Sequence, residues 1–139
     1  MRALPIGIQD FKAIRDEGYY FVDKSMLIGQ MLDQNDNGAY QFTRPRRFGK
    51  SLNLSMIDAF FNVKYKGNTW FDGLEISNHP EYDRYKNRFP VISVDLRAGT
   101  IEDFDDFMAN FNFMLFNLFD GFTYLRDSDK LNDENKAMF

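Results

Sequence analysis

Residues 43–51 read TRPRRFGKS, and this stretch decides which kind of fold the sequence predicts. Its last three residues match the end of the phosphate-binding loop pattern G-x-x-x-x-G-K-[ST], but Arg44 stands where the pattern has its first glycine. Arg44 lacks the backbone freedom that glycine supplies, whereas Pro45 stiffens the turn without a positive φ. The stretch is therefore either a variant phosphate loop or a basic surface turn that contains GKS.

The segments on either side of residues 43–51 match the context of a phosphate loop. Residues 39–43, AYQFT, predict a strand that enters the loop, and residues 50–62, KSLNLSMIDAFFN, predict a helix that leaves it. In such a loop, backbone N–H groups at the helix N-terminus hold phosphate oxygens, the lysine adds positive charge and the serine hydroxyl ligates Mg²⁺. The pattern thus predicts a nucleoside triphosphate site, with Lys50 on the outer phosphates and Ser51 on the metal.

The rest of the sequence predicts helices and strands in alternation. Helices are expected at residues 10–17, 24–33, 81–88 and 101–119, the last with Thr100 as its cap, and further strands at residues 19–22 and 90–96. Residues 64–78 are expected to be irregular, and residues 125–139 to form a solvated helix or a loose tail. Alternating strands and helices predict an α/β fold, a partial phosphate-loop NTPase-type parallel sheet flanked by helices, with residues 1–139 as one domain.

Composition excludes several classes of function. The formal net charge of −4 argues against a protein that mainly coats nucleic acid, and the lack of cysteine excludes disulfides and thiolate metal sites. His79 alone offers an imidazole and is expected in a surface loop, so a Ser-His-Asp triad or a zinc site built on histidines is not predicted. No uninterrupted apolar run approaches the roughly 20 residues that span a bilayer, and the N-terminus has no signal-peptide core. The expected location is the cytoplasm.

Several blocks of the sequence together resemble the AAA-ATPase-like family of bacterial proteins. LPIGIQDFKAIRDEGYYFVDKSMLI at residues 4–28 and FTRPRRFGKSLNLSMIDAFF at residues 42–61 carry the resemblance, and FDGLEIS and FPVISVDLR are similar to later blocks. The family is similar to the archaeal ATPase branch of phosphate-loop proteins and tolerates the arginine at position 44. The resemblance implies that this chain is the N-terminal part of an ATP-binding domain. Members often carry a C-terminal nuclease-like domain of the PD-(D/E)XK type, through which nucleic acid would become a partner.

The resemblance also implies a set of site residues. Arg46 and Arg47 would be the family's basic pair, flanking the phosphates or a partner, and the backbone from Arg46 to Lys50 would cradle the phosphates of ATP. Ser51 would ligate Mg²⁺. The nucleotide-binding residues would be Arg46, Arg47, Phe48, Gly49, Lys50, Ser51 and Leu52.

Hydrolysis needs an acidic residue at the end of a second strand, and enzymatic activity is therefore left open. Asp95, at the end of VISVDL, imitates that position, but by family position it belongs to the preceding strand. It is either the acid on the Mg²⁺ side or an aspartate that hydrogen-bonds its own loop. The alternative function is a non-catalytic interaction module, in which the RPRR patch at residues 44–47 binds nucleic acid or an acidic partner.

Three smaller groups have both a functional and a structural interpretation. Tyr20, Asp23 and Lys24 lie either beside the nucleotide or in a strand followed by a helix N-cap at Asp23. Four carboxylates near the start of the long helix form either a metal cluster or a solvated face that complements the helix dipole, and they are Glu102, Asp103, Asp105 and Asp106. The phenylalanines of residues 104–119 are expected to pack against the sheet.

Overall fold

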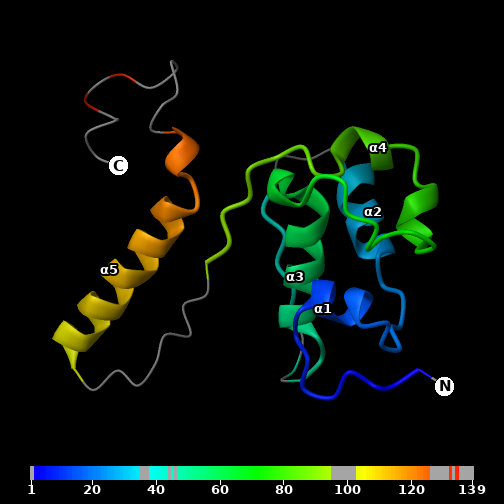
Figure 1. The fold of residues 1–139 in the computed structure, drawn as a ribbon, viewed down its shortest axis with the longest axis horizontal. Coiled ribbons are helices and arrows are strands. Elements are labelled where there is room, and N and C mark those ends of the chain that lie inside the picture. Colours follow the sequence, from blue (N-terminus) through cyan, green and yellow to red (C-terminus); the bar gives the residue numbers. More distant parts are fainter. Residues whose placement is uncertain are drawn as a thin grey trace. The chain divides into compact units, whose positions relative to one another are not determined.

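The structure, a computed structural model, describes residues 2–34, 38–43, 45, 47–94, 103–125, 132 and 134. The chain divides into two compact units, Met1–Val91 and Ile92–Phe139. The first unit contains α1, α2, α3, η1, η2 and α4, and the second contains α5 and η3 (Figure 1). Their bounds are α1 Phe11–Asp16, α2 Met26–Asp33, α3 Lys50–Phe61, η1 Val63–Tyr65, η2 Glu75–Asn78, α4 Tyr82–Tyr85, α5 Phe104–Asp120 and η3 Thr123–Leu125.

The predicted parallel sheet is wrong for this structure, because the described residues contain no strand. Residues 19–22, 39–43 and 90–94 take irregular conformations, and residues 95 and 96 lie outside the described part. One isolated parallel bridge joins Asn62 and Phe89 among the described residues. An apolar β-branched run indicates a preference for extended backbone, but a ladder forms only when a second segment lies alongside it. Among the described residues no second segment forms a ladder with these stretches, so the described part of the chain is helical instead of α/β.

Helices α1 and α3 begin and end within one residue of their predicted positions, whereas α4 covers only Tyr82–Tyr85 of the predicted residues 81–88. The Asp10 side chain accepts a hydrogen bond from the Lys12 N–H at 3.0 Å and caps α1, and Gly18 follows the helix with a φ of +69°. Helix α2 begins later than predicted, because Ser25 and not Asp23 is its N-cap residue. Residues 64–78, which were expected to be irregular, contain the short 3₁₀-helix η2 and the end of η1.

The core of the first unit is built mainly from aromatic and aliphatic side chains of α1, α2, α3 and the segment around η2. Phe60 lies at its centre, with ring centroids 5.3 Å from Phe71 and 5.7 Å from Tyr82. Phe11 of α1 packs 5.0 Å from Phe71, so α1 and α3 share one aromatic cluster. The buried residues of this core are Phe11, Ile28, Met56, Ala59, Phe60, Phe71, Leu74 and Ile76. Edge-to-face and tilted ring contacts of this kind add to the stabilisation by apolar burial.

Asp23 and Ser25 join the start of α2 to η2. The Asp23 carboxylate accepts hydrogen bonds from the Ser25 N–H at 2.8 Å and the Glu75 N–H at 2.7 Å. The buried Ser25 hydroxyl accepts a third bond from the Ile76 N–H at 3.1 Å. Burial by itself would raise the pKa of Asp23, but hydrogen bonds from Ser25 and Glu75 hold that pKa below its usual value. These contacts favour the structural interpretation of the YYFVDKS segment.

Replacing Asp23 with alanine is expected to destabilise the protein more at neutral pH than at acid pH. The native pKa of Asp23 lies below the unfolded value of about 3.9, so its stabilisation is present above that value. The stabilisation disappears as the pH falls through the lower native pKa. Urea unfolding of wild type and Asp23→Ala at pH 7 and at about pH 3 tests this, because the difference in unfolding free energy should shrink on acidification. An equal difference at both pH values would contradict it.

His79 is largely covered, contrary to the expected surface loop. Its side chain is only 7% exposed, with Nε2 3.2 Å from the Asp33 carboxylate. The Glu81 N–H donates to Nδ1 at 3.3 Å, which leaves the ring proton on Nε2 to face Asp33. The imidazole therefore links the end of α2 to the start of α4.

Helix α5 of the second unit begins after Asp103, which is its N-cap residue. The Asp103 side chain accepts a hydrogen bond from the Asp106 N–H at 2.8 Å, whereas Thr100, the predicted cap, lies outside the described residues. The expected packing of its phenylalanines against a sheet is wrong here, because α5 buries no residue and Phe104 is 71% exposed. Within the described ranges, no helix combines the length and apolar character needed to cross a membrane.

Candidate functional site

The GKS motif lies where α3 begins, as the sequence predicts. Gly49 is the N-cap residue with a φ of +76°, and Arg47 has a φ of +66°, while Phe48 between them has no positive φ. Left-handed residues in such a loop are typical of concavities in which successive backbone N–H groups bind an anion. The first intrahelical hydrogen bond runs from the Asn53 N–H to the Gly49 carbonyl at 2.9 Å, so the N–H groups before Asn53 have no acceptor within the helix.

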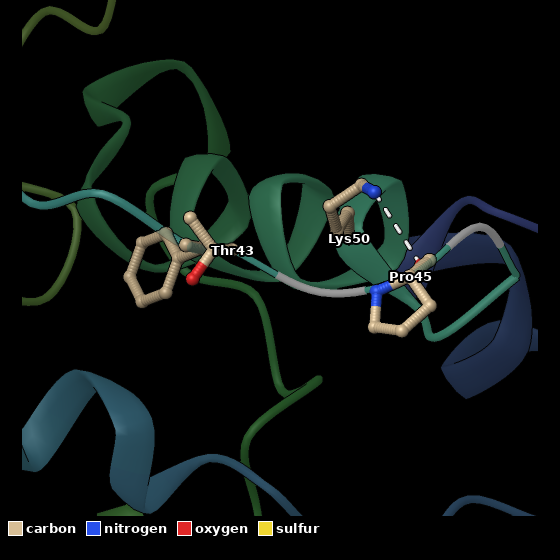
Figure 2. Close-up of a pocket in the computed structure, with 4 residues that line it drawn as sticks. Thr43, Pro45 and Lys50 are labelled. Carbon is tan, nitrogen blue, oxygen red and sulfur yellow. Dashed lines mark hydrogen bonds between the residues drawn. The ribbon is translucent and has the colours of Figure 1, made fainter.

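Lys50 folds back over the loop that precedes it. Its ammonium donates a hydrogen bond to the Pro45 carbonyl at 3.4 Å, and Figure 2 shows this contact made from the first turn of α3. An open pocket of about 520 Å³ lies here, lined by Phe42, Thr43, Pro45 and Lys50. The motif alone does not indicate Phe42 and Thr43 as pocket residues, because they precede the pattern and belong to the expected strand. The Lys50–Pro45 hydrogen bond is long and exposed, so exchanging it for a bond to an anion costs little.

The structure describes some of the predicted site residues and leaves others outside its described part, and the described ones differ in exposure. Arg44 and Arg46 lie outside the described residues, so the RPRR patch is described only in part. Arg47 and Phe48 are exposed at the loop, and Phe48 is 62% exposed. Residues 49, 51 and 52 are half-buried. Ser51 and Lys50 share the first turn of α3, which is the relative placement that a phosphate loop requires.

Helix α1 fixes the position of α3 one turn beyond Ser51. The Ser55 hydroxyl donates to the Asp10 carboxylate at 2.9 Å and accepts from the Phe11 N–H at 3.0 Å. Lys12 adds ion pairs, its Nζ lying 3.5 Å from Asp10 and 3.8 Å from Asp58. Burial opposes the charge, but the Tyr65 hydroxyl and these carboxylates raise the pKa of Lys12 above its usual value. The sequence does not reveal the contact between α1 and α3, because Asp10 and Ser55 are more than forty residues apart.

The remaining acidic candidates lie elsewhere or in the undescribed part. Asp95 and Glu102 are outside the described residues. Asp103 caps α5, and Asp105 and Asp106 are exposed in its first turn, as the interpretation as a solvated, dipole-complementing face predicts. Within the described ranges, no group of three or more histidine or acidic side chains could hold a metal ion.

Tyr20 and Lys24, the other members of the YYFVDKS group, are exposed. The backbone N–H of Tyr20 donates to the Ala3 carbonyl at 2.8 Å, which holds the N-terminal segment against this stretch. This contact of Tyr20 thus concerns the packing of the chain.

Comparison with known proteins yields a family and one curated relative. The model of the AAA-ATPase-like family, described as predicted AAA-ATPase, matches residues 5–139. An uncharacterized protein in the vnfD 5' region of Azotobacter chroococcum mcd 1 is 39% identical over 107 residues. That alignment covers 76% of this chain and 19% of the relative, so the chain spans about a fifth of that protein. No solved structure matches the chain.

The family match extends over nearly the whole chain and includes the loop, α3 and the segments that pack on α3. The similarity therefore rests on much more than the GKS triplet. The chain belongs to the AAA-ATPase-like family, described as predicted AAA-ATPase.

Proposed function

We propose that this chain binds ATP together with Mg²⁺ at the N-terminus of α3. The observation that carries the proposal is the placement of Gly49, Lys50 and Ser51 directly at the start of a 12-residue helix. The helix dipole and the N–H groups of its first turn favour the charge of a phosphate. Membership in a family described as predicted AAA-ATPase supports the same ligand.

Each residue of the triplet has a distinct role in the proposed complex. The left-handed backbone of Gly49 lets the phosphate approach the main chain closely. Lys50 exchanges its hydrogen bond with the Pro45 carbonyl for the outer phosphates, since a charged acceptor binds an ammonium more strongly than a neutral carbonyl does. The Ser51 hydroxyl supplies an oxygen ligand of the kind that Mg²⁺ prefers. Neighbouring Arg47, exposed on the loop, adds positive charge on the approach to the phosphates.

The proposal concerns binding and does not include hydrolysis. Asp95, the sequence-level candidate for the acid on the Mg²⁺ side, lies outside the described residues. The alternative of a basic interaction patch rests on residues 44–47, of which Pro45 and the exposed Arg47 are described. The placement of Gly49, Lys50 and Ser51 at the start of α3 favours ATP binding over this alternative.

Replacing Ser51 with alanine is expected to remove most of the Mg²⁺ dependence of ATP binding. Wild type should bind ATP more tightly with Mg²⁺ than with a chelator, because the hydroxyl and the phosphates share the ion. Ser51→Ala should bind equally weakly under both conditions, while Ser51→Thr keeps the hydroxyl and should retain the difference. Isothermal titration calorimetry of the three proteins measures these affinities. Absence of ATP binding by wild type would contradict the proposed function, and an unchanged Mg²⁺ dependence in Ser51→Ala would contradict the role of Ser51.

A further inference from the structure

A second basic hollow lies at the far end of α3 from the GKS loop. It has a volume of about 330 Å³ and is lined by Lys66, Gly67, Asp83, Lys86, Asn87 and Arg88. Asn87 contacts the last turn of α3, whereas Lys50 begins this helix. A helix of 12 residues is about 18 Å long, so the hollow is separate from the proposed nucleotide site.

Asn87, one of the lining residues, anchors the backbone around this hollow through its side-chain hydrogen bonds. The Asn87 side chain is buried, and its amide nitrogen lies 2.9–3.2 Å from the carbonyls of Ala59, Phe60 and Asn62. Its amide oxygen accepts a hydrogen bond from Asn68 at 2.8 Å. These bonds join the segment after α4 both to α3 and to the turn after η1. The backbone that carries the surrounding cations is thus held by the interior of the unit.

Three cations and one carboxylate line the hollow. Lys66, Lys86 and Arg88 form no ion pair with any residue of the described ranges, and neither does Asp83. Lys86 is held in place by a 2.9 Å hydrogen bond to the Asn68 carbonyl. Lys66 and Arg88 are exposed. With Asp83 included, the lining of the hollow has a formal charge of +2.

The unit that carries the hollow is itself positive, although the chain is negative. Of the 17 lysines and arginines, 13 lie in residues 1–91 and 4 in residues 92–139; of the 21 acidic residues, 11 and 10 lie in the same two ranges. The first unit has a formal charge of +2 and the second of −6, which sum to the −4 of the whole chain. The net charge of the chain thus hides a basic unit that is suited to an anionic partner.

Aromatic residues alternate with cations in the sequence that contributes Lys86, Asn87 and Arg88 to the hollow. Residues 84–89 read RYKNRF, and the rings of Tyr85 and Phe89 stack with centroids 5.9 Å apart at 24°. Phe89 directly follows Arg88 of the hollow and is 42% exposed, while its ring also packs 6.1 Å from the ring of Phe61. The Arg84 guanidinium lies over the Tyr85 ring at 5.3 Å. Cations interleaved with an accessible aromatic ring suit a ligand that carries both phosphates and planar bases.

We propose that this surface, Lys66, Lys86, Arg88 and Phe89, binds single-stranded nucleic acid. Lys66, Lys86 and Arg88 contact the phosphodiester backbone, and Phe89 stacks with a base. An acidic peptide would use the same cations but would gain nothing from the aromatic face. The observations therefore favour a nucleic-acid strand over an acidic protein.

The test is fluorescence anisotropy of the full chain with a labelled oligothymidylate, which has no base pairing of its own. Lys66→Glu with Arg88→Glu is expected to weaken binding by about tenfold or more and to flatten its salt dependence, because two phosphate contacts are lost. Arg2→Glu with Lys24→Glu makes the same change in net charge at exposed positions outside the hollow and should have a much smaller effect.

Phe89→Leu separates stacking from charge. It should weaken binding by about fivefold or more and leave the salt dependence unchanged. Circular dichroism and thermal melting of each variant show whether its fold is intact. The proposal is overturned if wild type does not bind the oligonucleotide, if both charge variants bind alike, or if folded Phe89→Leu binds like wild type. Equal competition by polyglutamate would also overturn it and would assign the surface to an acidic protein.

Discussion

Replacing Lys50 with alanine is expected to weaken ATP binding by about a hundredfold, since a hydrogen bond to a charged group contributes up to about 3 kcal/mol. The Lys50 ammonium is the charge that the structure places at the pocket of the α3 N-terminus, next to Pro45. Arg47 and the backbone N–H groups remain in the variant, but they supply no compact charge at the same position. Because the Lys50 side chain is exposed, the substitution should leave the fold intact.

Isothermal titration calorimetry with ATP and Mg²⁺ measures the effect of Lys50→Ala. Lys64→Ala is the matched control, because Lys64 is an exposed lysine just beyond the other end of α3 and should leave the affinity unchanged. Thermal melting of both variants checks that they are folded. Equal affinity of wild type and Lys50→Ala for ATP would refute the proposed function.

Replacing Asn87 with alanine is expected to lower the unfolding free energy by about 3 kcal/mol, a large part of the stability of a small domain. The Asn87 amide nitrogen donates hydrogen bonds to the carbonyls of Ala59, Phe60 and Asn62. Alanine would remove this donor from carbonyls that are wholly or partly buried. Asn87 also has a φ of +54°, a left-handed conformation that asparagine tolerates better than alanine.

Two further variants separate the causes of the Asn87 effect. Asn87→Gly removes the side chain but accepts the positive φ, so it should be more stable than Asn87→Ala by about 1 kcal/mol. Asn78→Ala removes an exposed asparagine from η2 and should change stability by no more than about 0.5 kcal/mol. Urea unfolding followed by circular dichroism gives all three values. Wild-type stability in Asn87→Ala would show that these hydrogen bonds do not hold the end of α3.

The helices and the GKS loop could be predicted from the sequence because their signals are local. The cap at Asp10, the stop at Gly18 and the start of α3 after Gly49 each depend on residues within one or two turns. The predicted sheet failed for the opposite reason. Residues 19–22 and 90–94 have the composition of strands, but pairing depends on a neighbouring segment that the local pattern does not specify.

The same limit applies to the candidate sites. The sequence indicated Lys50 and Ser51 by their spacing, and the structure places both in the first turn of α3. It did not indicate the basic hollow, because Lys66 and Arg88 are 22 positions apart and belong to different turns. His79 was misplaced at the surface because its partner Asp33 lies 46 positions away.

The sequence by itself determined where α1 and α3 begin, where the GKS motif lies and to which family the chain is similar. Those features depend on the identity and spacing of residues close together in the chain, which the sequence specifies directly. Only the tertiary structure decided that Asn87 closes the end of α3 and that Ser55 joins Asp10. Such pairings bring together residues far apart in the chain. They form only when burial of the apolar core brings these residues together, because a buried polar group must then find a partner within the protein.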